Sequence, residues 1–272
     1  MRTKRATLLA ATGALALALI AQTGYVPPAY AAAAPPIPRA YQVSSVADSG
    51  GGLAAISADG GTSLHLAPAS ESDSWPKLVA TNLATGVDET VGLDLTGAPA
   101  PHIITAAISG NGRTVSYVAS ASNAAELHLP ASVDQNITTA LFVHDRLSGE
   151  TRWVPTPTLG VAASLLTLGE LSMSEDGNRV AVRITLPLPE YAALTQPQGV
   201  LVVTLGGAAP AYRVVGPADL VPPDGDLPTL QPRLRGFTLS GDGTVLAVTA
   251  RRETTPYLMR FGAADGARLP AE

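Results

Sequence analysis

The apolar residues of the chain fall in short runs that alternate with polar positions, and four of these runs end in the same short phrase. Each phrase is an apolar residue and a serine, then a turn that contains Asp-Gly or Asn-Gly. The phrases occupy residues 56–60, 108–112, 173–177 and 239–243. Glycine adopts the positive φ of a tight hairpin turn at no steric cost, and Asp and Asn tolerate it. Each phrase therefore predicts a β-hairpin, and the recurrence predicts a repeat protein.

The β-rich runs around these phrases predict four strands in each of the first three repeats and three in the last. The predicted strands are 53–57, 62–67, 77–83 and 87–94; 104–109, 114–120, 140–146 and 150–156; 170–174, 179–185, 199–205 and 211–215; and 236–240, 244–250 and 257–261. Helical periodicity is nearly absent, which favours an all-β fold. Four antiparallel strands in each of several repeats are typical of the blades of a β-propeller. The predicted blades lie near 53–94, 104–156, 169–217 and 235–272.

The last repeat lacks an outer strand, whereas the chain has an unpaired predicted strand at residues 40–46. The segment Ala40-Tyr41-Gln42-Val43 is similar to Ala211-Tyr212-Arg213-Val214, the predicted outer strand of the third repeat. We therefore predict that the first strand completes the last blade and closes the ring, because closure removes exposed strand edges. The alternatives are closure by pairing two chains, which implies a homodimer, and a degenerate blade hidden in a loop.

The repeats resemble a known family. An apolar-Ser-x-Asp-Gly phrase, two β-runs and an Asp-x-x-x-Gly-Glu segment, seen most fully at residues 145–150, resemble the WD40-like repeats of TolB-type β-propellers. The resemblance covers residues 40–272 and implies blades rather than a particular ligand. The chain departs from the family in two ways. The family usually has six or more blades, and it usually has proline after the serine, where this chain has Ala58, Gly110, Glu175 and Gly241.

The amino terminus has the pattern of a targeting segment. A basic start at residues 2–5 precedes an uncharged core at 6–21, and Ala29-Tyr30-Ala31 supplies an A-x-A cleavage signal. A retained membrane anchor is the alternative. The chain has no cysteine, which excludes disulfides and a lipid-anchored cysteine. We expect a secreted, extracellular protein that is soluble after cleavage of its signal. The predicted organisation is a signal peptide at 1–31, an Ala/Pro linker at 32–39 and a propeller at 40–272.

Composition limits the classes of ligand. Of the 272 residues, 46% are hydrophobic and 14% are charged, which is typical of a packed globular chain. The net charge of -5 offers no basic face, so we predict no nucleic-acid partner. His65, His102, His128 and His144 stand far apart and form no metal-binding motif, so we predict neither a metal nor a cofactor.

The predicted strand order places most of the loop length on one side of the blades. We call this side the long-loop rim; it comprises residues 68–76, 95–103, 121–139, 186–198 and 216–235. The opposite side, the turn rim, holds the short hairpin turns. Long loops on a rigid scaffold commonly carry binding sites, although surface loops also tolerate insertions without a function. The candidate binding residues are Trp75, His128, Asp134, Tyr191, Asp224, Asp226, Arg233 and Arg235.

The preferred hypothesis is therefore a scaffold that binds an envelope or extracellular protein or a peptide. An enzyme, such as a hydrolase or lyase with its site in the central funnel, and a structural half-ring that dimerises are the alternatives. No catalytic residue is predicted, and we interpret Ser49 as a turn residue because Ile108 stands where a protease-like histidine would be needed. We expect Val-Val in place of Asp242-Gly243 to impair folding, and trimming of residues 121–139 to be tolerated.

Overall fold

The computed structural model divides the chain into two units, residues 1–38 and 39–272. The described residues all belong to the second unit and are 53–69, 74–157, 159, 166–185, 197–207, 209–221, 233–252 and 255–270. The predicted signal peptide, linker and first strand lie outside them. In the described part, no helix is long and apolar enough to cross a membrane.

The described residues form fifteen strands in four antiparallel sheets, and within each sheet every strand pairs with the next one along the chain. The first sheet contains β1 (Leu53–Ile56), β2 (Thr62–Ala67), β3 (Lys77–Asn82) and β4 (Asp88–Thr90); the second contains β5 (Ile103–Ile108), β6 (Thr114–Ser120), β7 (Thr139–Asp145) and β8 (Glu150–Val154). The third contains β9 (Leu168–Met173), β10 (Arg179–Thr185), β11 (Gln198–Thr204) and β12 (Ala211–Val215); the fourth contains β13 (Arg233–Leu239), β14 (Val245–Arg252) and β15 (Thr255–Gly262). The prediction of an all-β fold with four antiparallel sheets is confirmed.

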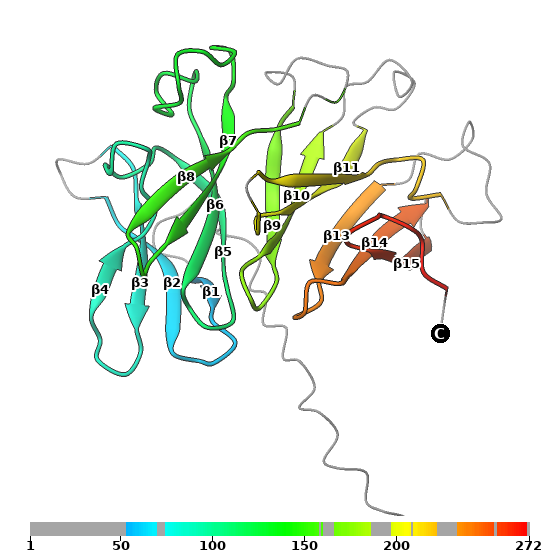
Figure 1. Ribbon diagram of the computed structural model, residues 1–272, viewed down its shortest axis with the longest axis horizontal. Coiled ribbons are helices and arrows are strands. Elements are labelled where there is room, and N and C mark those ends of the chain that lie inside the picture. The colour runs from blue at the N-terminus through cyan, green and yellow to red at the C-terminus, as the bar shows by residue number, and fades with distance from the viewer. Residues whose placement is uncertain are drawn as a thin grey trace, which may run out of the picture. The chain divides into compact units, whose positions relative to one another are not determined.

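The four sheets follow one another as propeller blades do (Figure 1). Their first strands β1, β5, β9 and β13 pack on one another in this order, so these strands are innermost. Between the described strands the packing runs from the first sheet to the fourth and does not return to the first, so the row of blades is not closed into a ring.

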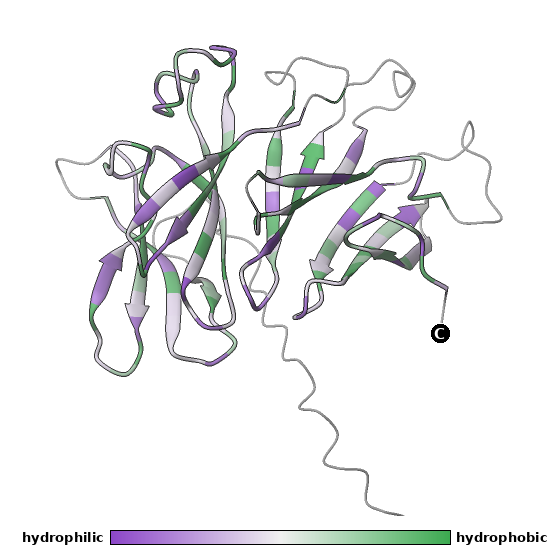
Figure 2. Ribbon diagram, viewed as in Figure 1, coloured by the Kyte–Doolittle hydropathy of each residue, from purple (hydrophilic) through white to green (hydrophobic). Residues whose placement is uncertain are grey.

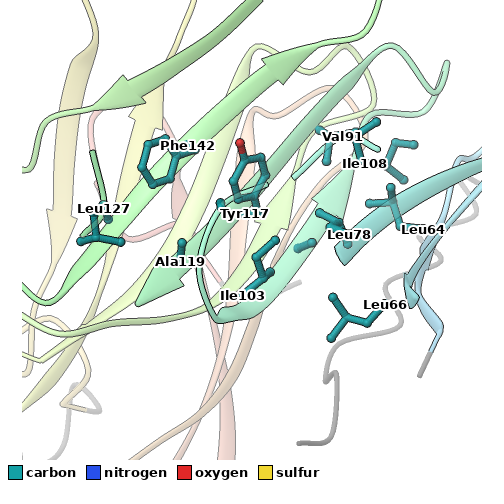
Figure 3. Close-up of a cluster of buried hydrophobic side chains, with 14 of the residues drawn as sticks. Leu64, Leu66, Leu78, Val91, Ile103, Ile108, Tyr117, Ala119, Leu127 and Phe142 are labelled. Atoms are coloured by element: carbon teal, nitrogen blue, oxygen red, sulfur yellow. The ribbon is translucent and has the colours of Figure 1, made fainter. Parts of the chain in front are cut away.

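Apolar side chains fill the space between neighbouring sheets. Alternate residues of a strand face the same side, so each sheet contributes one apolar row to each gap. Figure 3 shows the cluster between the first and second sheets, where Leu64 and Leu78 face Tyr117 and are fully buried. The rings of Tyr117 and Phe142 stack with their centroids 5.6 Å apart. Similar clusters fill the next two gaps, so face-to-face packing of the blades stabilises the fold.

The four phrases form four copies of one turn. In each, the serine hydroxyl donates to the Asp or Asn side chain two residues later; these bonds are Ser57–Asp59 (2.6 Å), Ser109–Asn111 (2.8 Å), Ser174–Asp176 (2.6 Å) and Ser240–Asp242 (2.6 Å). The serine Oγ also accepts a hydrogen bond from the backbone amide of the residue that starts the next strand. For Ser174 this residue is Arg179, at 3.0 Å. Only the glycine of each turn has positive φ. The acidic or amide side chain is therefore needed as an acceptor and not for its backbone conformation.

These turns also join the sheets to one another. The backbone amide of Asp59 donates a hydrogen bond to the carbonyl oxygen of Gly110 at 3.0 Å. The amide of Gly110 donates in the same way to the carbonyl oxygen of Glu175 at 2.7 Å, and the amide of Glu175 donates to the carbonyl oxygen of Gly241 at 2.8 Å. Three backbone hydrogen bonds thus link the inner turns of all four sheets. The phrase that marks the repeats in the sequence is also the point at which neighbouring blades are tied together.

Among the described residues the fourth sheet has three strands, and Arg268 forms a bridge to its edge strand β15. In the third sheet Val203 pairs with Tyr212 of the outer strand. The equivalent position in β15 is Phe261, which forms an isolated bridge with Arg268. If residues 40–43 paired with β15 in the way that residues 211–214 pair with β11, Tyr41 would be opposite Phe261. Arg268 is the residue that forms a bridge with Phe261 at this position. Completion of this sheet by residues 40–46 lies outside the described residues and stays a prediction.

The loop at residues 121–138 is part of the core, which changes the expectation that it can be trimmed. Leu127 and Ala124 are fully buried in the cluster between the first two sheets. The side chain of Asn123 accepts the amide of Glu126 at 2.9 Å, and Glu126 accepts the amide of Ser122 at 3.1 Å, which fixes a compact turn. Removal of this loop would expose the apolar residues beneath it.

Candidate functional site

Five of the eight candidate binding residues lie within the described part of the chain. Trp75 precedes β3 and His128 and Asp134 follow β6, so they belong to the long-loop rim of the first two sheets. Arg233 and Arg235 lie at the start of β13, on the same rim of the fourth sheet. Tyr191, Asp224 and Asp226 lie outside the described residues. The described candidates thus form two groups, one at the first two sheets and one at the fourth sheet.

Trp75 is an exposed aromatic residue whose ring packs against a neighbouring ring. Its side chain is 49% exposed, and its ring centroid lies 5.0 Å from that of His102 at an interplanar angle of 35°. Nδ1 of His102 lies 3.2 Å from Oγ of Ser120 at the end of β6. A tryptophan with restricted motion loses little entropy when a partner covers it. Because the sequence places Trp75 and His102 in different loops, it did not reveal the pair.

A hydrogen-bonded histidine–aspartate pair joins two loops at the same rim. Nδ1 of His128 lies 2.6 Å from Oδ2 of Asp94, whose carboxylate is fully buried while the imidazole is half exposed. Burial raises the pKa of Asp94, but hydrogen bonds from Thr96 and His128 outweigh it, so this pKa lies below its ordinary value. His128 has a φ of 53°, a conformation that is rare outside glycine. A buried charge thus holds an exposed imidazole on the rim.

Asp134 shapes its own loop. Its Oδ1 accepts the backbone amide and the side-chain amide of Asn136, both at 3.0 Å. Such bonds are typical of Asx turns. The carboxylate oxygen is engaged within the loop, so Asp134 contributes to the rim by supporting the loop backbone.

The turn rim contains a groove that the sequence did not predict. The groove has a volume of ≈ 360 Å³ and lies between the second and third sheets. Nε and Nη2 of Arg113 donate three hydrogen bonds to the carboxylate of Asp145 across one wall, and this guanidinium, with the backbone amides of Leu147 and Ser148, lowers the pKa of Asp145 to about 2. Asn111 and Asp176, on other walls, are acceptors within the turns described above. The charged and polar groups of this groove are therefore largely used to hold the turns.

The described residues contain no group of three or more His, Cys, Asp or Glu side chains that could hold a metal ion. A hydrolytic triad needs a nucleophile within hydrogen-bond reach of its histidine. The Asp94–His128 pair supplies two of the three groups, and among the described residues the structure gives no hydroxyl that bonds to His128. The pair therefore has a clear structural role, which is to attach the loop at 121–138 to the connection between the first two sheets.

Comparisons with known proteins locate similar folds. No family model and no curated protein matches the chain. Among solved structures, the chain is similar to TolB from Acinetobacter baumannii (14% identity, 78% of this chain and 41% of that chain, TM-score 0.42). It is also similar to a putative TolB from Agrobacterium tumefaciens (14%, 82% and 61%, 0.45) and to the β-propeller domain of the Trilobed protease from Pyrococcus furiosus (11%, 81% and 70%, 0.39). The chain thus spans less than half of the first of these proteins. The strand order and register carry the propeller assignment, and these likenesses carry no function.

Proposed function

We propose that the protein is an exported scaffold with β-propeller blades that binds a protein or peptide segment through its long-loop rim. The observation that carries the proposal is the exposed indole of Trp75, which packs against the ring of His102. Tryptophan is the residue type most enriched among the anchors of protein interfaces. The half-exposed imidazole of His128 adds a polar group on the same rim, as expected around an aromatic anchor.

Rigidity of the scaffold supports this role. The blades are tied by backbone bonds at the turn rim and by apolar packing between the sheets, so the loops of the opposite rim stand on a fixed base. Sites on loops that a rigid framework positions lose little free energy to ordering when they bind. Export rests on the predicted signal peptide. The hypotheses of an enzyme and of a structural dimer stay predictions from the sequence.

A peptide-display selection with matched variants tests the proposal. Random peptides are selected on the purified protein, and their affinities are then measured for the wild type, Trp75→Ala and Leu147→Ala. Leu147 is the control because it is 77% exposed and lies on the turn rim. We expect Trp75→Ala to weaken binding about 30-fold, the effect of losing about 2 kcal/mol at an anchor residue. Leu147→Ala should bind as the wild type does. Equal affinities of all three proteins would contradict the proposal.

A further inference from the structure

The rim of the third and fourth sheets gathers arginine residues from three strands. Arg233 of β13 is directly paired with Arg251 of β14, and Arg235 follows two residues later along β13. Arg183 of β10 reaches across from the third sheet and donates to the carbonyl oxygens of Leu234 and Arg235, both at 3.3 Å. Four guanidinium groups therefore lie in one region of a chain whose net charge is -5. Figure 2 shows the hydrophilic start of β13 beside the hydrophilic end of β14.

The charges of this cluster are only partly compensated by the described residues. Glu170 pairs with Arg183 at 2.7 Å. Arg233 and Arg235 are exposed, and the buried Nε of Arg251 has no hydrogen-bond partner. Like charges that face each other across two strands destabilise a sheet, and an unsatisfied buried donor adds to the cost. The like charges of the cluster thus carry a cost that a bound anion would relieve.

From this arrangement we propose that Arg233, Arg235 and Arg251 form a binding site for an acidic peptide segment. The inference deepens the proposed function, on which it rests, by giving the chemical class of the partner. A planar guanidinium binds a carboxylate through two parallel hydrogen bonds, so neighbouring arginines suit a segment with several Asp or Glu residues.

A short acidic segment fits this site better than a long polyanion does. Charges separated by more than about 8 Å are largely screened at physiological ionic strength, so a short segment experiences mainly the local cluster. A nucleic acid or an anionic bilayer extends over much of the surface and meets the excess of acidic groups on the rest of the chain. The local positive charge in a negative protein therefore favours a peptide.

Fluorescence anisotropy on the full chain tests the inference. The probe is a labelled peptide of six consecutive glutamates, and the control peptide has glutamines in their place. The proteins are the wild type, the double variant Arg233→Gln/Arg235→Gln, and Arg152→Gln, which removes an exposed arginine of the turn rim. We expect the glutamate peptide to bind the wild type and Arg152→Gln alike and the double variant at least about tenfold more weakly. Its affinity for the wild type should also fall as salt is raised.

Three results would overturn the inference: equal binding of the two peptides, equal binding to the wild type and the double variant, or tighter binding of phosphatidylserine vesicles than of the glutamate peptide. Thermal melting of the double variant checks that it is folded, and the salt titration of the wild type tests the site without any substitution. If display-selected peptides depend on Trp75 but not on Arg233 and Arg235, the proposed function stands and the acidic site does not.

Discussion

The amide of Glu175 donates a hydrogen bond to the carbonyl oxygen of Gly241 at 2.8 Å, and this bond joins the inner turns of the third and fourth sheets. Glu175 follows the serine of its phrase, at the position where the repeats that this chain resembles usually have proline. Proline has no N–H and could not make the bond. The departure from the family's pattern therefore has a physical reason at Gly110 and Glu175, whose amides link neighbouring blades.

Proline at this position should be tolerated in the first turn and harmful in the third. In the first turn the amide of Asp59, not that of Ala58, donates to the next sheet. Ala58 lies at the first central position of its turn, where proline is favoured. We expect Glu175→Pro to lower the free energy of unfolding by about 1–3 kcal/mol, because it leaves the carbonyl oxygen of Gly241 without its donor. Ala58→Pro should be neutral or stabilising.

Urea denaturation of the two proline variants and the wild type checks this prediction. Variants of equal stability would show that the bond between Glu175 and Gly241 does not stabilise the protein. The bond would then be a result of the packing of the blades and would add nothing to the free energy of unfolding.

Gly177 of an inner turn should be less replaceable than Gly149 of an outer turn. Gly177 and Gly149 both have a φ of 72°. A Cβ at Gly149 meets open space, whereas at Gly177 it would lie 2.8 Å from Oγ1 of Thr114 in the neighbouring sheet. Both alanine variants should lose about 1–2 kcal/mol of the free energy of unfolding, because alanine would have to adopt the left-handed backbone conformation. Gly177→Ala should lose about 1–3 kcal/mol more, because the adjoining sheet must shift.

Thermal melting distinguishes the two glycine variants. A loss of 1 kcal/mol lowers the Tm of a domain of this size by about 2–4 °C. Gly177→Ala should therefore melt several degrees below Gly149→Ala, and the reverse order would contradict the close contact between these two sheets.

The loop at 121–138 should be needed for stability. Leu127 has no exposed surface, and Leu147 is 77% exposed. Truncation of a buried leucine to alanine costs about 2–5 kcal/mol, whereas exposed substitutions stay within about 0.5 kcal/mol. We expect Leu127→Ala to show the larger loss in urea denaturation and Leu147→Ala to show none. If both variants were equally stable, the loop would not be needed for stability, and the prediction that it can be trimmed would hold.

Histidine 144 should make the fold sensitive to mild acid. His144 is buried, and this burial lowers its pKa below the ordinary value of 6.5. The unfolded chain therefore binds a proton at a higher pH than the folded one, so stability falls as pH drops below 6.5 toward the folded pKa and then levels off. The loss is at most about 1.4 kcal/mol per pH unit.

The variant His144→Gln isolates this effect. Glutamine retains a polar group near Thr151, whose hydroxyl lies 3.0 Å from Nδ1 of His144, but it does not titrate. Urea denaturation at pH 7 and pH 5 should show a smaller loss for the variant than for the wild type. The other histidines are common to both proteins, so parallel losses would exclude His144 as the cause.

The repeated phrases made the fold predictable from the sequence, because each is a local device that specifies a hairpin. The strands 62–67, 114–120, 179–185 and 211–215 agree with the structure to the residue. The predicted outer strand 87–94 is shorter because the chain turns away after Thr90, where the amides of Val91 and Gly92 both donate to Leu78. Such an ending depends on a contact between strands, which a linear pattern does not contain.

The candidate site was less predictable. Aromatic and arginine residues in long loops could be identified by type, as Trp75 and Arg233 were. Their partners could not, since His102 and Asp94 belong to a connection between blades and meet the other loops only after folding. The sequence also did not show that Arg251 lies opposite Arg233, because that pairing depends on the register of two strands.

The four phrases form inner turns of successive blades, and backbone hydrogen bonds join these turns to one another. Hydrogen exchange followed by NMR on the wild-type protein measures the protection of each of these amides. The amides of Gly110 and Glu175 should exchange much more slowly than those of Asn111 and Asp176, for which the structure gives no bond between sheets. Equal, fast exchange at all four amides would contradict the account, because the turns would then face solvent separately.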